Sequence, residues 1–365
     1  MGCEAVRVRT TLTSRMTALL LLLGLLGAPA CSRDEAAGPT LSPATMPPAT
    51  VDPCRDRPTA TTGTTSLAIA DTAPPAGPAS IGGRITDGTC GTPVTGVKVL
   101  LLDETVQTKL LGATATGADG TYHFASVATG RYRLELFDPS STYVTSFYRD
   151  VPDFDEAETV DLQAAGLTFD ERIWTVADQP VPAYRGEAGG KTIAVIGDSL
   201  VQQTTGALRS KLEPIGPTSV RGISLQRTDQ MLPVAQKYAA TTPDMVVLAL
   251  GNNDLLEQHS TVETMRHLQD LVDLFPRARC VFVLNVNSHT GQDEFNARAN
   301  ELNLDLLRLS IERPQVKLID WDADVRLLLT QGVSPGAWFS DTLHLTPLGA
   351  GAYATAMEGA VTRCL

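Results

Sequence analysis

The sequence is poor in basic residues. Its 365 residues include 29 Lys and Arg against 41 Asp and Glu, so the formal net charge is −12 at pH 7. A protein that binds nucleic acid holds the phosphates with clustered Lys and Arg side chains, and the acidic excess therefore excludes a nucleic-acid partner. Hydrophobic residues still make up 43% of the chain, which is typical of globular proteins. The length predicts two or three domains.

The sequence also lacks an apolar run of the ~18 residues that a membrane-spanning helix requires. The apolar run at residues 17–27 is shorter; it follows a segment with three arginines and precedes the small residues 28–30. This order is typical of a secretory signal segment with its cleavage site. We therefore predict that residues 1–30 are a signal peptide and that the mature chain is exported.

Cys31 follows the expected cleavage site directly and resembles the lipid-modified cysteine of bacterial lipoproteins. The resemblance implies a lipid anchor on the cell envelope, with membrane contact through the lipid alone. Secretion or release into the periplasm after cleavage at Ala30 is the alternative. Residues 31–78 are rich in Pro, Thr and Ala and have almost no large apolar side chains. Such a segment cannot bury enough surface to order itself, so we expect a disordered tether.

The later cysteines lack the spacing of a zinc site, and the sequence predicts no metal and no cofactor. Four cysteines follow position 31: Cys54, Cys90, Cys280 and Cys364. An even number in an exported chain indicates two disulfides. Of the three possible pairings we predict Cys54–Cys90 and Cys280–Cys364, because each pair then stays within one structural unit.

Residues 79–165 alternate short β-rich runs with glycine-containing turns. We predict strands at 79–85, 97–102, 121–127, 132–137, 143–148 and 159–162, which together form a small antiparallel β-sandwich. The segments Asp119-Gly120-Thr121-Tyr122 and Gly130-Arg131-Tyr132 resemble those of carboxypeptidase-regulatory-like and collagen-adhesin B-type modules. That resemblance implies a spacer or an adhesive stalk. Residues 166–190 are expected to be a connector.

Residues 191–365 have a different period, in which apolar strands alternate with helical patterns. We predict strands at 191–197, 218–222, 245–250, 280–286 and 316–319. Helices are expected at 200–212, 226–240, 261–275, 293–311 and 347–361. Near-continuous apolar strands between helices indicate a five-stranded parallel sheet covered on both faces, a three-layer α/β sandwich. In such sheets ligands bind beyond the carboxyl ends of the strands.

Four polar segments lie at that edge of the predicted sheet. They are Gly197-Asp198-Ser199-Leu200, Gly222, Gly251-Asn252-Asn253-Asp254 and Asp341-Thr342-Leu343-His344. Taken singly, each reads as a helix cap or a turn. Taken together, they supply the groups that acyl transfer requires, which are a nucleophile, a base, a carboxylate that orients the base and donors for the oxyanion.

We predict that Ser199 is the nucleophile, that His344 is the base and that Asp341 orients it. The backbone N–H groups of Ser199 and Gly222 and the side-chain amide of Asn253 are the expected oxyanion donors. Asp198 and Asp254 are expected to stabilise their loops. His289 and Trp338 lie near the same edge in the sequence pattern. His289 either contacts substrate or is an exposed loop residue, and Trp338 either lines the pocket or packs in the core.

In this order the four segments resemble the SGNH (GDSL-type) hydrolase superfamily, over residues 191–365. The resemblance implies a flavodoxin-like fold and a Ser199–His344–Asp341 triad. It also implies an oxyanion hole made of Ser199, Gly222 and Asn253. Gly222 departs from the family pattern, because Arg221-Gly222-Ile223-Ser224 lacks the further glycines that are usual there.

The leading hypothesis is an exported serine esterase that cleaves carboxylic esters, with short acyl groups on carbohydrates or other small esters as substrates. One alternative is O-acyl transfer to a glycan through the same acyl-enzyme, because residues 287–321 and His344-Leu345-Thr346-Pro347 resemble SGNH domains attached to membrane acyltransferases. Another is a non-catalytic, lipid-anchored binding or adhesion protein. The expected partner is a small-molecule or glycan ester, and nothing in the sequence indicates an oligomeric state.

Overall fold

The computed structural model describes residue 54 and residues 69–365, except 106–108, 141, 152–153 and 155. The predicted signal peptide (1–30), the lipid-modified Cys31 and most of the predicted tether lie outside the described residues and stay predictions. Within the described residues, no helix is both long and apolar enough to span a bilayer.

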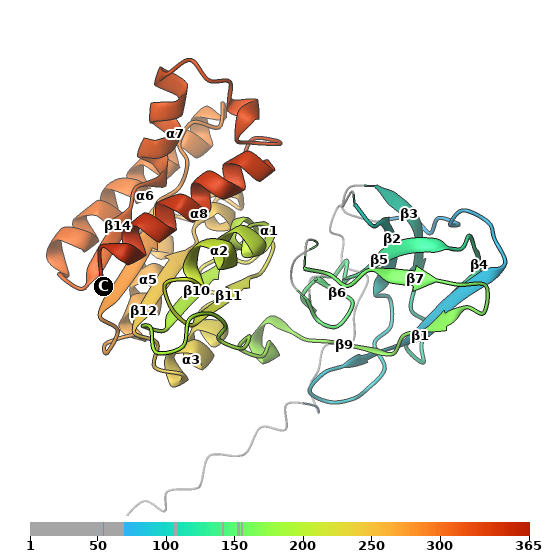
Figure 1. The fold of residues 1–365 in the computed structure, drawn as a ribbon. Coiled ribbons are helices and arrows are strands. Elements are labelled where there is room, and N and C mark those ends of the chain that lie inside the picture. Colours follow the sequence, from blue (N-terminus) through green and yellow to red (C-terminus); the bar gives the residue numbers. More distant parts are fainter. Residues whose placement is uncertain (1–53, 55–68, 106–108, 141, 152–153, 155) are drawn as a thin grey trace, which may run out of the picture. The chain divides into compact units, whose positions relative to one another are not determined.

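The N-terminal described part contains two β-sheets (Figure 1). The first sheet consists of β1 (Ala79–Asp87), β4 (Thr121–Val127), β8 (Leu167–Thr168) and β9 (Glu171–Ile173). The second consists of β2 (Lys98–Asp103), β3 (Leu110–Ala115), β5 (Gly130–Phe137), β6 (Ser146–Phe147) and β7 (Val160–Leu162). Alternate residues of β1 and β5, among them Ile81, Ile85, Leu134 and Leu136, meet in one buried core. This is the packing of a two-sheet sandwich, in which every second side chain points inward.

The pairing in these sheets is antiparallel, except that β8 and β9 run parallel to β1. Both short strands fall in residues 166–190, which the sequence predicted to be a connector. They escape notice because strands of two and three residues show no alternating pattern. A short 3₁₀ helix, η1 (Val176–Asp178), follows them. The likeness of this part to named spacer modules stays a prediction.

The rest of the connector lies along β11 (Thr218–Gly222), the edge strand of a second, parallel sheet. Arg185 and Thr218 exchange two backbone hydrogen bonds of 2.9 and 2.6 Å. The Oγ of Ser219 donates to the carbonyl of Pro182 at 2.6 Å. An open strand edge leaves backbone groups unpaired. Through these hydrogen bonds the connector pairs with part of the β11 edge and covers it. The described residues of both parts belong to one unit, Asp52–Leu365.

The C-terminal part confirms the predicted α/β fold with a five-stranded parallel sheet. Its strands run in the order β11, β10 (Ile193–Gly197), β12 (Met245–Ala249), β13 (Cys280–Leu284) and β14 (Val316–Ile319). Every residue of β10, β11, β12 and β13 is buried. Such burial follows from helices on both faces of the sheet.

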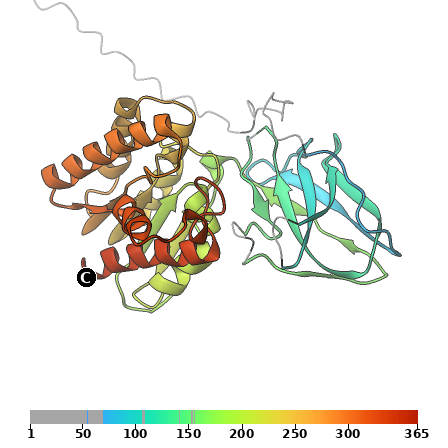
Figure 2. The same ribbon diagram turned by 90° about the horizontal axis from the view of Figure 1, so that it is seen from above.

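The helices divide between the two faces of the sheet (Figures 1 and 2). One face is covered by α3 (Leu232–Ala240), α5 (Thr261–Asp273) and α6 (Asp293–Glu312). The other is covered by α1 (Ser199–Gln203), α2 (Thr205–Leu212), α7 (Trp321–Thr330) and α8 (Pro347–Thr362). Two short helices, α4 (Asn252–Leu256) and η2 (Pro335–Ala337), lie in the connections. The chain reverses its direction of winding between β10 and β12, where open α/β sheets bind their ligands.

Two disulfides are present, and they are the two that the sequence predicts. Cys280 at the start of β13 is bonded to Cys364, which follows α8. Cys54 is bonded to Cys90 in the turn after β1. The first bond lies within the α/β part, and the second joins Cys54 of the predicted tether to the N-terminal sheets.

Candidate active site

Ser199 is the first residue of α1, directly after the carboxyl end of β10. The turn is tight, because a Cβ on Gly197 would lie 2.2 Å from Val201 Cγ2. Only a glycine allows the helix to begin so close to the strand. The N–H of a first helical residue has no acceptor within its own helix, so the Ser199 N–H is available to a ligand at this edge.

Asp198 connects the ends of two neighbouring strands. Its Oδ1 accepts a hydrogen bond from the Leu200 N–H at 3.0 Å and caps α1. Its Oδ2 accepts from Asn252 Nδ2, at the start of α4, at 3.0 Å. Burial raises the pKa of Asp198 to about 6, although these two hydrogen bonds act in the opposite direction. The side chain fixes the loops that carry Ser199 and Asn253.

His344 lies between Ser199 and Asp341. Its Nε2 is 3.3 Å from the Oγ of Ser199, and its Nδ1 is 2.8 Å from Asp341 Oδ2. The second oxygen, Oδ1, accepts from the backbone N–H groups of Leu343 and His344, both at 2.7 Å. One carboxylate thus holds the imidazole with one oxygen and the loop with the other. The structure brings the three predicted residues together as a hydrogen-bonded chain.

Asp341 is ionised under ordinary conditions. Partial burial acts to raise its pKa, but the hydrogen bonds from the backbone N–H groups of Leu343 and His344, and from the His344 ring, outweigh it. The pKa of Asp341 therefore lies below its ordinary value. An ionised carboxylate at Nδ1 keeps the proton on that nitrogen and leaves Nε2 free to accept one.

Aromatic side chains pack beneath the loop that carries Asp341 and His344. Trp338 accepts the Thr346 N–H on its backbone carbonyl at 2.8 Å, just before α8 begins. Its ring stacks on the buried Trp321 with centroids 5.3 Å apart. Trp338 therefore packs beneath the loop and does not line the cavity at Ser199. His289 lies elsewhere too, with its Nε2 3.6 Å from Asp322 Oδ1.

Asn253 is buried in the first turn of α4. Its Nδ2 donates to the carbonyl of Gln226 at 2.9 Å, and Gln226 lines the cavity that contains Ser199. An amide nitrogen carries two protons, so one remains for a ligand. The role of Asn253 as an oxyanion donor stays a prediction.

The structure assigns Gly222 to packing. A Cβ at this position would lie 2.0 Å from the backbone nitrogen of Gln202, because α1 crosses directly over the end of β11. Neither Gly222 nor Asn253 lines the cavity at Ser199, and the role of Gly222 as an oxyanion donor stays a prediction.

Leu225, three positions after Gly222, lies at the cavity. It lines the cavity with Ser199 and His344, is half exposed and has a φ of +63°. A bulky side chain rarely adopts this conformation, and such strain concentrates at functional sites. Within the described part of the chain, the Leu225 N–H has no hydrogen-bond acceptor. Sequence reasoning missed it because no glycine marks the position.

The cavity at the triad has a volume of about 280 Å³. Its wall on the α/β side includes Ser199, Gln202, Gln203, Ser224, Leu225, Gln226 and His344. The opposite wall comes from the N-terminal sheets and includes Glu135, Phe137, Asp138, Tyr143, Val144, Thr145, Phe147 and Phe154. The volume lies at the small end of ligand pockets, which hold roughly 300–1,000 Å³.

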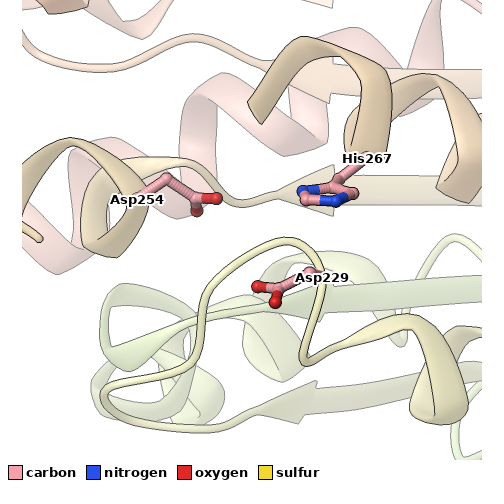
Figure 3. Close-up of side chains that lie close together, drawn as sticks. All are labelled: Asp229, Asp254 and His267. Carbon is pink, nitrogen blue, oxygen red and sulfur yellow. The ribbon is translucent and has the colours of Figure 1, made fainter. Parts of the chain in front are cut away.

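Asp229, Asp254 and His267 point toward one another close to the site (Figure 3). Each offers a ligand atom, and these atoms lie within 4.8 Å of one another. However, the guanidinium of Arg227 pairs with both oxygens of Asp229, at 3.1 and 3.2 Å. Asp254 accepts from the N–H and hydroxyl of Thr228, at 3.0 and 2.6 Å. These contacts anchor the loop before α3, and a cation would have to compete with Arg227.

Residues 195–352 match the model of the GDSL-like lipase/acylhydrolase family. This part of the chain is a GDSL-like acylhydrolase domain. It contains Ser199, His344 and Asp341 linked by hydrogen bonds, and it is the domain of an ester hydrolase. No curated protein matches the sequence.

Several solved structures resemble the acylhydrolase domain. One is a lipolytic protein of the G-D-S-L family from Veillonella parvula, 17% identical, with 47% of this chain and 98% of that chain covered and a TM-score of 0.42. Another is a catalytic mutant of an acetylxylan esterase from Geobacillus stearothermophilus, with 17% identity, 49% and 94% coverage and a TM-score of 0.40. A third is the catalytic domain of a peptidoglycan O-acetyltransferase from Streptococcus pneumoniae. It is 16% identical, with 48% of this chain and 94% of that chain covered and a TM-score of 0.39. Likenesses of this size carry no argument about substrate.

Proposed function

We propose that the protein is an exported serine esterase that cleaves carboxylic esters through an acyl-enzyme. The observation that carries the proposal is the chain of contacts from Asp341 through His344 to Ser199, at 2.8 and 3.3 Å. A non-catalytic binding protein would have no need of an ionised carboxylate that holds a histidine against a serine hydroxyl.

In the proposed reaction the Ser199 Oγ attacks the ester carbonyl while His344 Nε2 takes its proton. The carbonyl oxygen becomes an oxyanion, which accepts hydrogen bonds from the Ser199 N–H and Asn253 Nδ2. We assign the remaining donor to the Leu225 N–H, in place of Gly222. When the C–O bond breaks, His344 returns the proton to the departing alcohol. Water then attacks the acyl-enzyme with His344 as base, and the acid is released.

The proposed substrates are short acyl esters of carbohydrates or of other small alcohols. The cavity volume of about 280 Å³ leaves room for a small group on either side of the ester bond. Export, and a lipid anchor at Cys31 followed by a tether, would place this activity at the cell envelope. These last elements rest on the sequence pattern of residues 1–78.

O-acyl transfer to a glycan is a second candidate. It uses the same acyl-enzyme, and a sugar hydroxyl replaces water in the second step. The observation that favours it is the second cavity wall, which encloses the space beside Ser199 where an acceptor would have to enter. Acyl donor supplied together with a sugar acceptor distinguishes the two, since transfer yields acylated sugar and hydrolysis yields free acid.

Turnover of 4-nitrophenyl acetate tests the proposed function. We expect the wild type to release 4-nitrophenol and Ser199→Ala to lose this activity. Ser310→Ala serves as the matched control, because Ser310 is near the end of α6 and, among the described residues, its hydroxyl bonds only the Leu307 carbonyl. Equal turnover by Ser199→Ala and the wild type contradicts the proposal, as does no turnover by a folded wild type on any ester offered.

A further inference from the structure

The cavity wall on the N-terminal side is preorganised. Asp138, at the end of β5, accepts from the N–H groups of Ser140, Thr142 and Tyr143 at 2.9, 3.0 and 2.9 Å. The Tyr143 hydroxyl in turn donates to Asp87 at 2.9 Å. A buried carboxylate with several backbone donors fixes a loop in one conformation. Ser140, Thr142 and Tyr143 are therefore held in place without a ligand.

The same segment is attached to the acylhydrolase domain. Val144 is buried in the hydrophobic core that lies under α3, together with Ile223 and Val234. Arg209 of α2 forms an ion pair with Glu156 of the N-terminal part. Residues from both parts of the chain thus share one core and one ion pair. The wall keeps its position opposite Ser199 through these contacts.

Two polar side chains on the cavity have capacity for further hydrogen bonds. Gln203 Nε2 is buried and has no hydrogen-bond partner among the described residues. The described residues also offer no hydrogen bond to the Glu135 carboxyl, which lines the facing wall. A buried donor without an acceptor destabilises the protein, and a ligand oxygen would supply the missing acceptor. A donor and an acceptor therefore face the same small space.

Apolar rings complete the wall. Phe137, Phe147 and Phe154 line the cavity beside Glu135, and Phe147 and Phe154 pack edge to face with centroids 5.9 Å apart. Phe147 and Phe154 are themselves buried, and the Arg133 guanidinium lies 4.2 Å from the centre of the Phe154 ring. The wall is therefore rigid and mainly apolar, with a few polar groups that can orient a small ligand. The described residues that line the cavity include no Lys or Arg side chain that could pair with an anionic ligand. A hydroxylated, uncharged ring fits both features.

We propose that this wall binds the alcohol part of the ester, and that Glu135 and Gln203 hydrogen-bond the hydroxyl groups of a sugar ring. The proposal rests on the proposed esterase function and adds to it the class of alcohol. It gives the N-terminal sheets a part in substrate selection, in addition to any spacer role.

Two acetate esters with different alcohols test this inference. One is an acetylated methyl xyloside, and the other is 4-nitrophenyl acetate, whose alcohol has no further hydroxyl group. The variants are Glu135→Gln and Gln203→Leu, with Glu104→Gln as the matched control, because Glu104 pairs with Arg131 away from the cavity. Thermal unfolding of each variant verifies that it is folded. The measured quantity is the ratio of kcat/KM for the sugar ester to kcat/KM for the aryl ester.

We expect each cavity variant to lower this ratio about five- to thirtyfold, the effect of one lost hydrogen bond to substrate. Glu104→Gln should leave the ratio as in the wild type. An unchanged ratio in both folded cavity variants overturns the inference, and so does a wild type that hydrolyses the aryl ester but not the sugar ester. The proposed function fails separately, by the absence of Ser199-dependent turnover of either ester.

Discussion

The Nε2 atom of His344 lies 3.3 Å from the Oγ atom of Ser199, although 145 positions separate the two residues in the chain. The parallel sheet brings them together, because Ser199 follows β10 and His344 precedes α8 at the same edge. Asp341 is only three positions from His344, so the base and its partner share one loop. The nucleophile is therefore positioned by the core of the sheet, and the base by a surface loop.

Asp341→Asn should lower kcat about 10³- to 10⁴-fold while leaving the fold intact. The amide removes the negative charge that stabilises the protonated His344 and can force the ring into the wrong tautomer. Hydrolysis of 4-nitrophenyl acetate measures the loss. Asp305→Asn, a partly exposed position on α6 that pairs with Arg308, is the control. Activity within a few-fold of wild type in Asp341→Asn would show that this carboxylate does not orient the base.

Leu225→Pro should lower kcat about 10²- to 10³-fold, as expected when one oxyanion donor is lost. Proline has no N–H, and its ring cannot adopt the φ of +63° found here. Leu225→Gly keeps the N–H and accepts the positive φ, so it should retain activity. Turnover of both variants, together with their melting temperatures, separates loss of the donor from loss of the fold. Full activity in the proline variant contradicts the assignment.

The Cys280–Cys364 disulfide closes a chain segment with a sequence separation of 84 residues. Replacing both cysteines by alanine should lower the free energy of unfolding by about 2–5 kcal/mol, mainly because the unfolded chain gains freedom. Urea unfolding of the double variant measures the change. A reducing agent should lower the stability of the wild type by at least as much, because it also breaks the Cys54–Cys90 bond. A double variant as stable as the oxidised wild type would mean that the bond does not form or does not constrain the chain.

Stability should fall as the pH rises from about 5 to 8. Burial raises the pKa of Glu135 from 4.5 to about 7 and that of Asp198 from 3.8 to about 6. Both carboxyls hold their protons more tightly in the folded protein than in the unfolded one. Their contribution is complete below the unfolded values and is lost as the pH passes the folded values. We expect a loss of roughly 1–3 kcal/mol per carboxyl at most.

Urea unfolding at pH 5 and at pH 8 measures this loss. Glu135→Gln removes one titrating group, and the difference in unfolding free energy between the two pH values should shrink in this variant. A difference as large as in the wild type would show that Glu135 does not titrate in this range.

The acylhydrolase domain follows closely from the sequence. β11 and β14 have the predicted bounds. β12 and β13 fall within the predicted ranges, because a short apolar run between helices is typical of a strand in a sheet buried on both faces. Ser199 and His344 were found because the carboxyl ends of parallel strands meet at one edge. α7 was not predicted. It begins at Trp321, two residues after β14, and no glycine or proline between the strand and the helix marks a turn.

Two features of the site could not be read from the sequence. Leu225 carries no mark of its positive φ, since that conformation is imposed by its surroundings and not by its side chain. The second cavity wall depends on packing between distant segments, such as Val144 against the core under α3. The alternation of apolar and polar residues along β5 shows that Glu135 points away from the core of the sandwich. Which residues it then faces depends on tertiary contacts.

Covalent labelling of Ser199 tests the central claim most directly. The folded wild type is incubated with a fluorophosphonate and digested, and the modified peptide is identified by mass spectrometry. We predict one phosphonylated residue, Ser199, with no labelling in Ser199→Ala and greatly slowed labelling in His344→Ala. Labelling at a different serine, or labelling that persists in Ser199→Ala, would contradict the account.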